Sequence, residues 1–222
     1  MSTQENETII PQDSLNRFSK KLIKIGAALS VIALLLLLII FYPVLKEEIK
    51  YFFTKEDTTA VVSFEPNVPE DNTLVPVDTM FGIVIPKIRA NAKIIENVDP
   101  YKSAEYQKAL TLGVAHAKGS STPDKGGNTF LFAHSSDNFY NANRYNSVFY
   151  LLTKLEFGDE IVLIKDNKLY TYQVTQKAIV EADRVEYLSP DSDINKVTLM
   201  TCWPPGTTLN RLVVVGELKQ SQ

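Results

Sequence analysis

The chain has 222 residues, a length that accommodates one domain of ordinary size and an appendage. Its net charge of -3 and its lack of a basic patch interleaved with aromatic residues argue against a nucleic-acid partner. Nine glycines and eleven prolines exclude a collagen-like or repetitive chain, and a hydrophobic share of 45% suits a packed globular core.

The first predicted element is a membrane anchor. Residues 25–45 carry no charge, and a helix needs roughly 20 apolar residues to cross the hydrocarbon core of a bilayer. The alternative is a cleaved signal peptide, whose apolar region would have only about 7–15 residues and would end at small residues. The stretch from Val44 to Glu47 offers no such cleavage site. We therefore expect an uncleaved, single-pass transmembrane helix at 25–45.

Charged residues around this helix predict its orientation. The residues before it include a positive cluster of Arg17, Lys20, Lys21 and Lys24. The positive-inside rule then makes residues 1–24 a cytoplasmic tail and places everything after Leu45 outside the cell. Residues 46–79 contain several prolines and acidic side chains, which predicts an extended linker. The folded domain is expected at 80–219.

Short strands dominate the pattern of the domain. The segments 82–85, 92–95, 129–133, 160–164, 169–175, 197–201 and 211–215 are apolar or alternating runs typical of strands. Lys165 to Lys168 is a hairpin signal, residues 104–110 predict a short helix, and a second helix is expected from Asn146 or Ser147 because Val148, Leu152 and Leu155 recur at helical spacing. About eight strands and two or three short helices, without regular alternation, predict a mainly β fold: a closed or nearly closed β-barrel.

Three polar side chains adjoin these strands. Cys202, the only cysteine, ends one strand, Arg211 begins the next, and His134 follows an earlier one. A lone cysteine outside the cell implies an intermolecular bridge or a reactive thiol; the alternative is an inert thiol packed as a small hydrophobe. A thiol, an imidazole and a guanidinium are the minimum set of groups for nucleophilic acyl transfer.

The run from Thr198 to Cys202 resembles the Thr-Leu-x-Thr-Cys signature of sortases, the membrane-bound cysteine transpeptidases of bacterial cell surfaces. The positions of His134 and Arg211 also fit that family, and the resemblance covers residues 81–218. It implies an eight-stranded barrel with its anchor in the bacterial cell membrane, and the loop pattern looks nearer to classes D and E. The implied reaction cleaves a C-terminal sorting motif, usually Leu-Pro-x-Thr-Gly, of secreted proteins and transfers the acyl group to an amine acceptor of the cell envelope.

The resemblance also implies a role for each site residue. Cys202 would be the nucleophile, since its thiolate is reactive and a thioester stays open to attack by amines. His134 would protonate the departing amide nitrogen and deprotonate the incoming amine. Arg211 would stabilise the oxyanion. Thr201 and Trp203 are candidates for substrate binding. The corresponding alternatives are a core histidine, a surface arginine and a plain turn after the cysteine.

His116, the second histidine, is expected to have a structural role. A zinc site formed by His116, His134 and Cys202 lacks metal-ligand spacing, so neither a metal nor another cofactor is expected.

Two other functions remain open. The domain could be a membrane-anchored cysteine protease or hydrolase, or a non-enzymatic surface-binding module. Papain-like proteases place the cysteine before the histidine, the reverse of the order here. Caspases need a Gln-Ala-Cys signature that is missing. L,D-transpeptidases carry a glycine before the cysteine, where this chain has Thr201.

Overall fold

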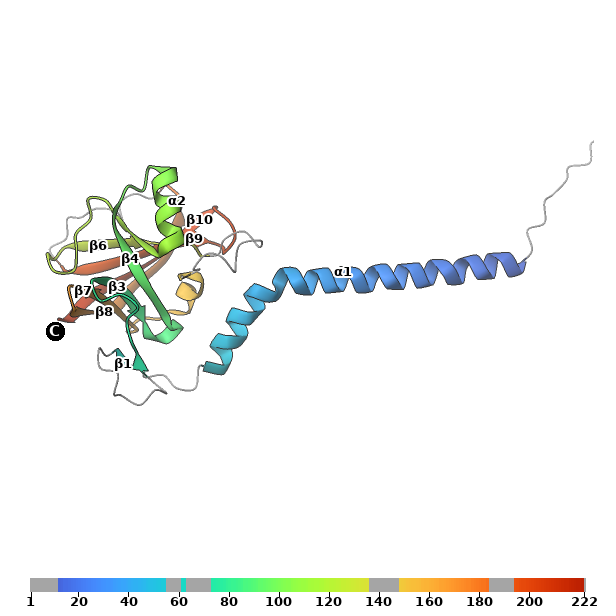
Figure 1. The fold of residues 1–222 in the computed structure, drawn as a ribbon, viewed down its shortest axis with the longest axis horizontal. Coiled ribbons are helices and arrows are strands. Elements are labelled where there is room, and N and C mark those ends of the chain that lie inside the picture. Colours follow the sequence, from blue (N-terminus) through green and yellow to red (C-terminus); the bar gives the residue numbers. More distant parts are fainter. Residues whose placement is uncertain (1–11, 55–60, 63–72, 136–147, 184–193, 222) are drawn as a thin grey trace, which may run out of the picture. The chain divides into compact units, whose positions relative to one another are not determined.

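A computed structural model of the chain describes residues 12–54, 61–62, 73–135, 148–183 and 194–221. The chain divides into two compact units, residues 1–46 and residues 47–222. The predicted start of a helix at Asn146 or Ser147 and residues 1–11 of the predicted tail lie outside the described residues. Figure 1 shows the helices and strands in the colours of the sequence.

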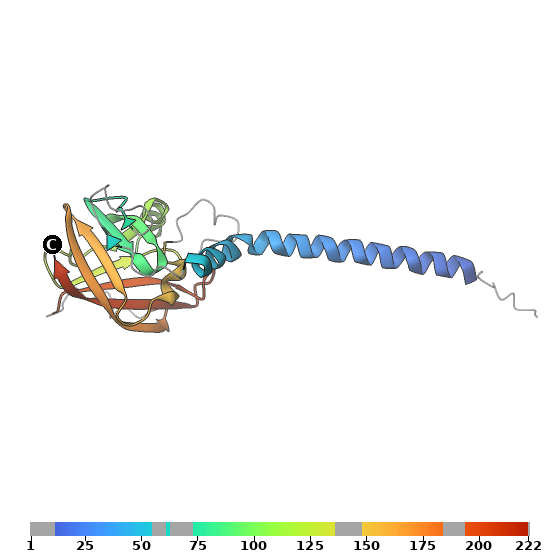
Figure 2. The ribbon, with the colours of Figure 1, turned by 90° about the horizontal axis from the view of Figure 1, so that it is seen from below.

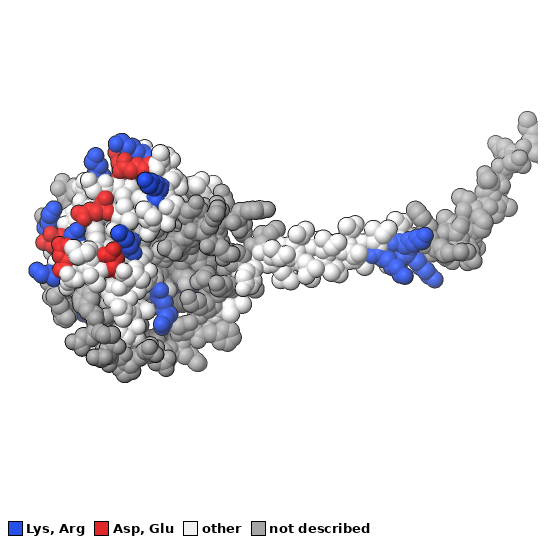
Figure 3. Space-filling view, viewed as in Figure 1, with Lys and Arg blue, Asp and Glu red and all other residues white. Residues whose placement is uncertain are grey.

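The first element is one long helix, α1 (Gln12–Thr54). It contains the predicted anchor at 25–45, and its stretch Lys20–Ile39 is long and apolar enough to cross a membrane. The side chains at positions 20–39 are all exposed, which is consistent with the predicted membrane-spanning helix. Figure 3 shows an uncharged stretch with lysines at one end, where Lys20, Lys21 and Lys24 lie.

The second unit is a barrel of eight strands. In chain order the strands are β3 (Phe81–Ile85), β4 (Ala90–Val98), β5 (Val114–Ala117), β6 (Asn128–Phe132), β7 (Glu160–Lys165), β8 (Lys168–Glu181), β9 (Lys196–Trp203) and β10 (Asn210–Ser221). They close in the order β10-β8-β7-β3-β4-β5-β6-β9. The pairs β4–β5 and β6–β9 are parallel and the other pairs are antiparallel. The predicted mainly β, eight-stranded barrel is confirmed.

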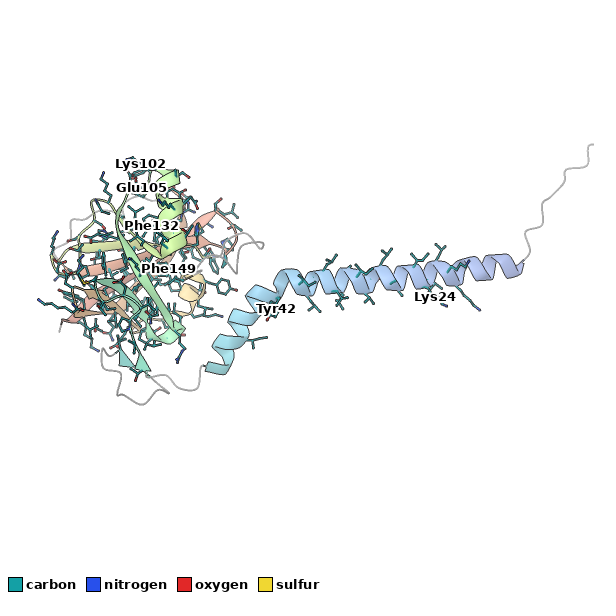
Figure 4. The ribbon with its side chains drawn as sticks, in the orientation of Figure 1. Lys24, Tyr42, Lys102, Glu105, Phe132 and Phe149 are labelled. Atoms are coloured by element: carbon teal, nitrogen blue, oxygen red, sulfur yellow. The ribbon has the colours of Figure 1, made fainter. Side chains whose placement is uncertain are left out.

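Within the described part of the domain, three short helices connect the strands. α2 (Ser103–Leu112) makes the crossover between the parallel strands β4 and β5, and η1 (Pro86–Ile88) joins β3 to β4. Tyr106 on α2 contacts the ring of Phe132 edge to face, with 6.4 Å between centroids. Figure 4 labels Phe132 beside α2, together with Glu105 in the first turn of that helix and Lys102 at its N-cap.

The third helix, η2 (Tyr150–Lys154), is a 3₁₀ helix and differs from the longer α-helix expected there. Phe149, Leu152 and Leu155 are fully buried, so the buried side chains recur every third residue. This spacing matches the three residues per turn of a 3₁₀ helix. The amide nitrogens of Leu152 and Leu155 each bond the carbonyl three residues earlier, at 3.2 Å.

The hairpin between β7 and β8 turns at the predicted place. Asp166 and Asn167 have φ of 50° and 61°, which is the left-handed pair that a two-residue hairpin turn requires. β8 is longer than the predicted strand at 169–175 because β10 pairs with it from Tyr170 to Glu181. Figure 2 shows β8 in orange beside β10 in red.

Ordered contacts also precede residue 80, within the segment expected to be an extended linker. β1 (Val61–Val62) and β2 (Thr73–Leu74) form a parallel pair, and Val62 and Leu74 pack against a small buried cluster of Val84, Val162 and Ile164. Asn91 Nδ2 donates to the carbonyl of Val75 at 2.7 Å, and its Oδ1 accepts from Val77 N at 3.0 Å. Residues on the N-terminal side of the predicted domain boundary therefore pack on the barrel.

Candidate active site

The candidate nucleophile lies near the end of β9. Cys202 is a free, half-buried thiol one residue before the end of that strand. β9 lies between β6, which runs parallel to it, and β10, which runs antiparallel. β6 ends two residues before His134, and β10 begins one residue before Arg211. The two strands were predicted from sequence, but their position on either side of β9 was not.

Strand register places one predicted residue opposite the cysteine and leads toward the other. Arg211 pairs directly with Cys202 across β9 and β10. Phe132 pairs with Met200 across β6 and β9, and Ala133 N continues that ladder to Met200 O at 3.2 Å. The regular pairing of β6 with β9 ends there, and His134 and Cys202 each follow the paired residues by two positions. Neighbouring strands lie about 5 Å apart, so the backbone of Cys202 is about one strand spacing from that of Arg211. All three side chains are half-buried.

Arg211 already holds the turn that follows the cysteine. Its Nη1 donates to Thr208 O at 3.1 Å and to Asn210 O at 3.0 Å. A guanidinium has five N–H donors, so with respect to the described residues the Nη2 and Nε groups remain for another acceptor. One side chain can therefore shape the loop between β9 and β10 and still meet a developing negative charge.

Thr201 and Trp203, the predicted substrate-binding residues, have other contacts. Thr201 is 4% exposed, and its Oγ1 donates to Ala133 O at 2.8 Å. Trp203 pairs with Asn210 and packs against the main core as a half-buried side chain. The turn after Trp203 is held by Thr207, whose amide and hydroxyl both donate to Pro204 O.

Sequence reasoning missed a second polar contact between β6 and β9. Thr198 Oγ1 donates to Asn128 Oδ1 at 2.8 Å, and both residues are buried. The only available signal was an asparagine at the start of an apolar strand, and the residues around it do not predict a hydrogen-bond partner 70 residues away. Close to the site, Ser135 Oγ is buried and has no hydrogen-bond partner among the described residues.

His116 is a buried part of the barrel wall, which agrees with its expected structural role. It is 3% exposed on β5; its Nδ1 accepts from Asn97 N at 3.2 Å, and its Nε2 donates to Ser121 O at 3.0 Å. These partners require a neutral imidazole with its proton on Nε2. Burial lowers the pKa of His116, because the charged form would lose its hydration.

The ring nitrogens of His116 are thus occupied, and they are not available for the zinc site that was considered from sequence. Within the ranges that the structure describes, no three His, Cys, Asp or Glu side chains gather as a metal ion would need. The charged side chains on the barrel surface are of both signs (Figure 3).

The chain is similar to known proteins in sequence and in fold. The family described as "Sortase domain" matches residues 83–219. The chain is 28% identical over 136 residues to sortase D of Bacillus subtilis, and the match covers 60% of each protein, less than two thirds of that relative.

Solved structures give the same result. Sortase C from Clostridium perfringens, solved with the C-terminal cell wall sorting motif, is 26% identical with a TM-score of 0.53, covering 82% of this chain and 88% of that one. Sortase E1 from Streptomyces coelicolor, with a tripeptide in the active site, is 25% identical with a TM-score of 0.53, covering 65% and 90%.

Proposed function

Because the chain belongs to the sortase family, we propose that it is a cysteine transpeptidase that joins secreted proteins to an amine of the cell envelope. The observation that carries the proposal is that Arg211 pairs with Cys202 from β10, while β6, the strand that leads to His134, pairs with β9 on its other side. This arrangement supports a nucleophile that has a proton carrier on one side and a permanent cation on the other. Acyl transfer through a thioester needs these three functions side by side.

In the first half of the proposed reaction, Cys202 Sγ attacks the carbonyl carbon of the scissile peptide bond. The carbonyl oxygen becomes an oxyanion, which the free N–H groups of Arg211 stabilise. When the C–N bond breaks, His134 gives a proton to the departing amine. The product of this half is a thioester between Cys202 and the N-terminal part of the substrate.

In the second half, an amine nitrogen attacks the thioester carbon. His134 takes a proton from that amine, an amide bond forms, and the sulfur of Cys202 leaves. Attack by water in place of the amine would make the same site a hydrolase. The choice of acceptor therefore distinguishes the transpeptidase from the hydrolase that was considered from sequence.

The membrane anchor supplies the setting. α1 contains an apolar stretch long enough to cross a membrane, and lysines lie at the N-terminal end of that stretch. With the positive end in the cytoplasm, the barrel faces outward, where secreted proteins pass. We propose a sorting motif similar to Leu-Pro-x-Thr-Gly as the substrate, supported by the sorting motif bound to the related sortase C. The relatives named sortase D and sortase E1 are in keeping with the predicted class.

The test uses the full-length protein in detergent, a quenched peptide carrying the sorting motif, and triglycine as the amine. Wild type should cleave the peptide and give a ligated product by mass spectrometry. Cys202→Ala should lose at least about 10³-fold in rate, because no other group can form the thioester. Thr208→Ala, which keeps the Thr208 carbonyl that Arg211 bonds, serves as the matched control and should remain active. Turnover by Cys202→Ala in a clean preparation would refute the nucleophile assignment.

A further inference from the structure

Two buried threonines on β9 connect it to β6, the strand that leads to His134. Thr198 donates to the side chain of Asn128, and Thr201 donates to the backbone carbonyl of Ala133, both at 2.8 Å. Both threonines lie in the run from Thr198 to Cys202. The two contacts are similar in length and burial, yet they lie at opposite ends of the parallel pair.

The contact made by Thr201 holds the backbone that carries the histidine. The carbonyl of Ala133 belongs to the same peptide group as the nitrogen of His134, and a peptide group is planar. A hydrogen bond to this oxygen therefore restrains the orientation of the whole peptide unit at which His134 begins. The regular pairing of β6 with β9 ends at Phe132, so His134 lies beyond the last paired residue.

We propose that Thr201 is a positioning residue that sets His134 relative to Cys202. It precedes the cysteine directly, and its hydroxyl is bonded to the residue that directly precedes the histidine. One side chain thus joins the backbone on both sides of the proposed catalytic pair. This role rests on the proposed function and differs from the substrate contact expected from sequence.

Burial and hydrogen bonding support positioning over substrate contact. Thr201 is 4% exposed, and its hydroxyl donates its proton to a carbonyl within the protein. A substrate therefore cannot reach this side chain or accept its proton without disrupting the contact between β6 and β9. Acid–base catalysis depends closely on geometry, and a misplacement of about 1 Å can cost about a hundredfold in rate. A threonine one residue away from the nucleophile can therefore strongly affect turnover without touching the reacting atoms.

The experiment compares Thr201→Val with Thr198→Val in the full-length protein. Each variant replaces a buried hydroxyl with a methyl group and removes one contact between the same two strands. Two properties are measured: kcat/KM for a quenched sorting peptide, and the pH dependence of alkylation of Cys202 by iodoacetamide. The second needs no substrate, and Cys202 is the only cysteine in the chain. Since the thiolate reacts, the profile responds to a neighbouring imidazole, and His134→Ala supplies the reference.

Thr201→Val should lower kcat/KM about 10- to 100-fold and shift the alkylation profile toward that of His134→Ala. Thr201→Ser should restore both properties, and Thr198→Val should stay within about threefold of wild type. If Thr201→Val does not fold, Thr201→Ala takes its place. Equal behaviour of the two valine variants in both measurements would overturn the proposal.

The alkylation measurement separates this proposal from the proposed function. Failure of wild type to process any sorting peptide, together with a shifted alkylation profile for Thr201→Val alone, would refute the substrate assignment and support the positioning role. Normal turnover by wild type with an unshifted alkylation profile in Thr201→Val would support the substrate assignment and refute the positioning role.

Discussion

Replacing Arg211 with lysine keeps the positive charge of the proposed site but removes the planar arrangement of donors. In the wild-type structure, Nη1 is bonded to the carbonyls of Thr208 and Asn210, at 3.1 and 3.0 Å. The Nη2 and Nε groups can meet an oxyanion while these bonds persist. A lysine has all of its donors on one nitrogen, so it cannot both hold the loop and reach the substrate oxygen.

The expected loss follows from this division of donors. Losing one oxyanion donor typically costs about 10²–10³ in kcat, equivalent to about 2.7–4 kcal/mol of transition-state stabilisation. The loop contacts are partly exposed, so their loss should cost at most about 0.5–1.5 kcal/mol of folding stability per bond. Arg211→Lys should therefore remain folded while kcat falls, because the negative charge develops only in the transition state.

Steady-state kinetics with a quenched sorting peptide, combined with thermal unfolding, test this reasoning. The control is Arg89→Lys, which makes the same change at an exposed arginine in the turn after η1. The control should match wild type in kcat and KM. A kcat for Arg211→Lys within about threefold of wild type would refute the reasoning, because the arginine would then act only as a local charge or not at all.

Three other predictions follow from the structure. His134→Ala should nearly abolish turnover, whereas His116→Ala should mainly lower the free energy of unfolding, by about 1–3 kcal/mol for each partner left unsatisfied; the reverse ranking in activity would contradict both assignments. Since burial lowers the pKa of His116, its contribution to stability is present above the unfolded value of about 6.5 and is lost as pH falls below it. Urea unfolding between about pH 5 and 7.5 should show this slope, and His116→Gln should reduce it. Deleting residues 1–53 should leave a soluble, active and stable barrel. Deleting residues 1–79 should lower the free energy of unfolding by about 2–4 kcal/mol. The reason is that Asp78 Oδ1 accepts from the amides of Met80 and Phe81, and that Leu74 packs on the barrel. Equal melting temperatures of the two truncated proteins would contradict the packing of residues 73–79.

Local patterns in the sequence predicted the elements that local physics controls. The uncharged run at 25–45 lies within α1, the two residues at 166–167 adopt the hairpin turn, and the apolar runs of the domain are strands. Local reasoning failed where a distant partner decides the conformation. β8 runs on to Glu181 because β10 pairs with it there, and η2 is a 3₁₀ helix because Phe149, Leu152 and Leu155 enter the core at a spacing of three.

The sequence by itself determined which residue types were available for chemistry: one thiol, one imidazole at a strand end and one guanidinium at the start of the next strand. Only the tertiary structure decided that β6 and β10 flank β9, and that Arg211 pairs directly with Cys202. Only the tertiary structure shows the hydrogen bond from Thr201 to Ala133, which lies 68 residues earlier. The physical reason is that strand order and register depend on hydrogen bonds and core packing between distant segments, whereas residue spacing reports only the conformation of near neighbours.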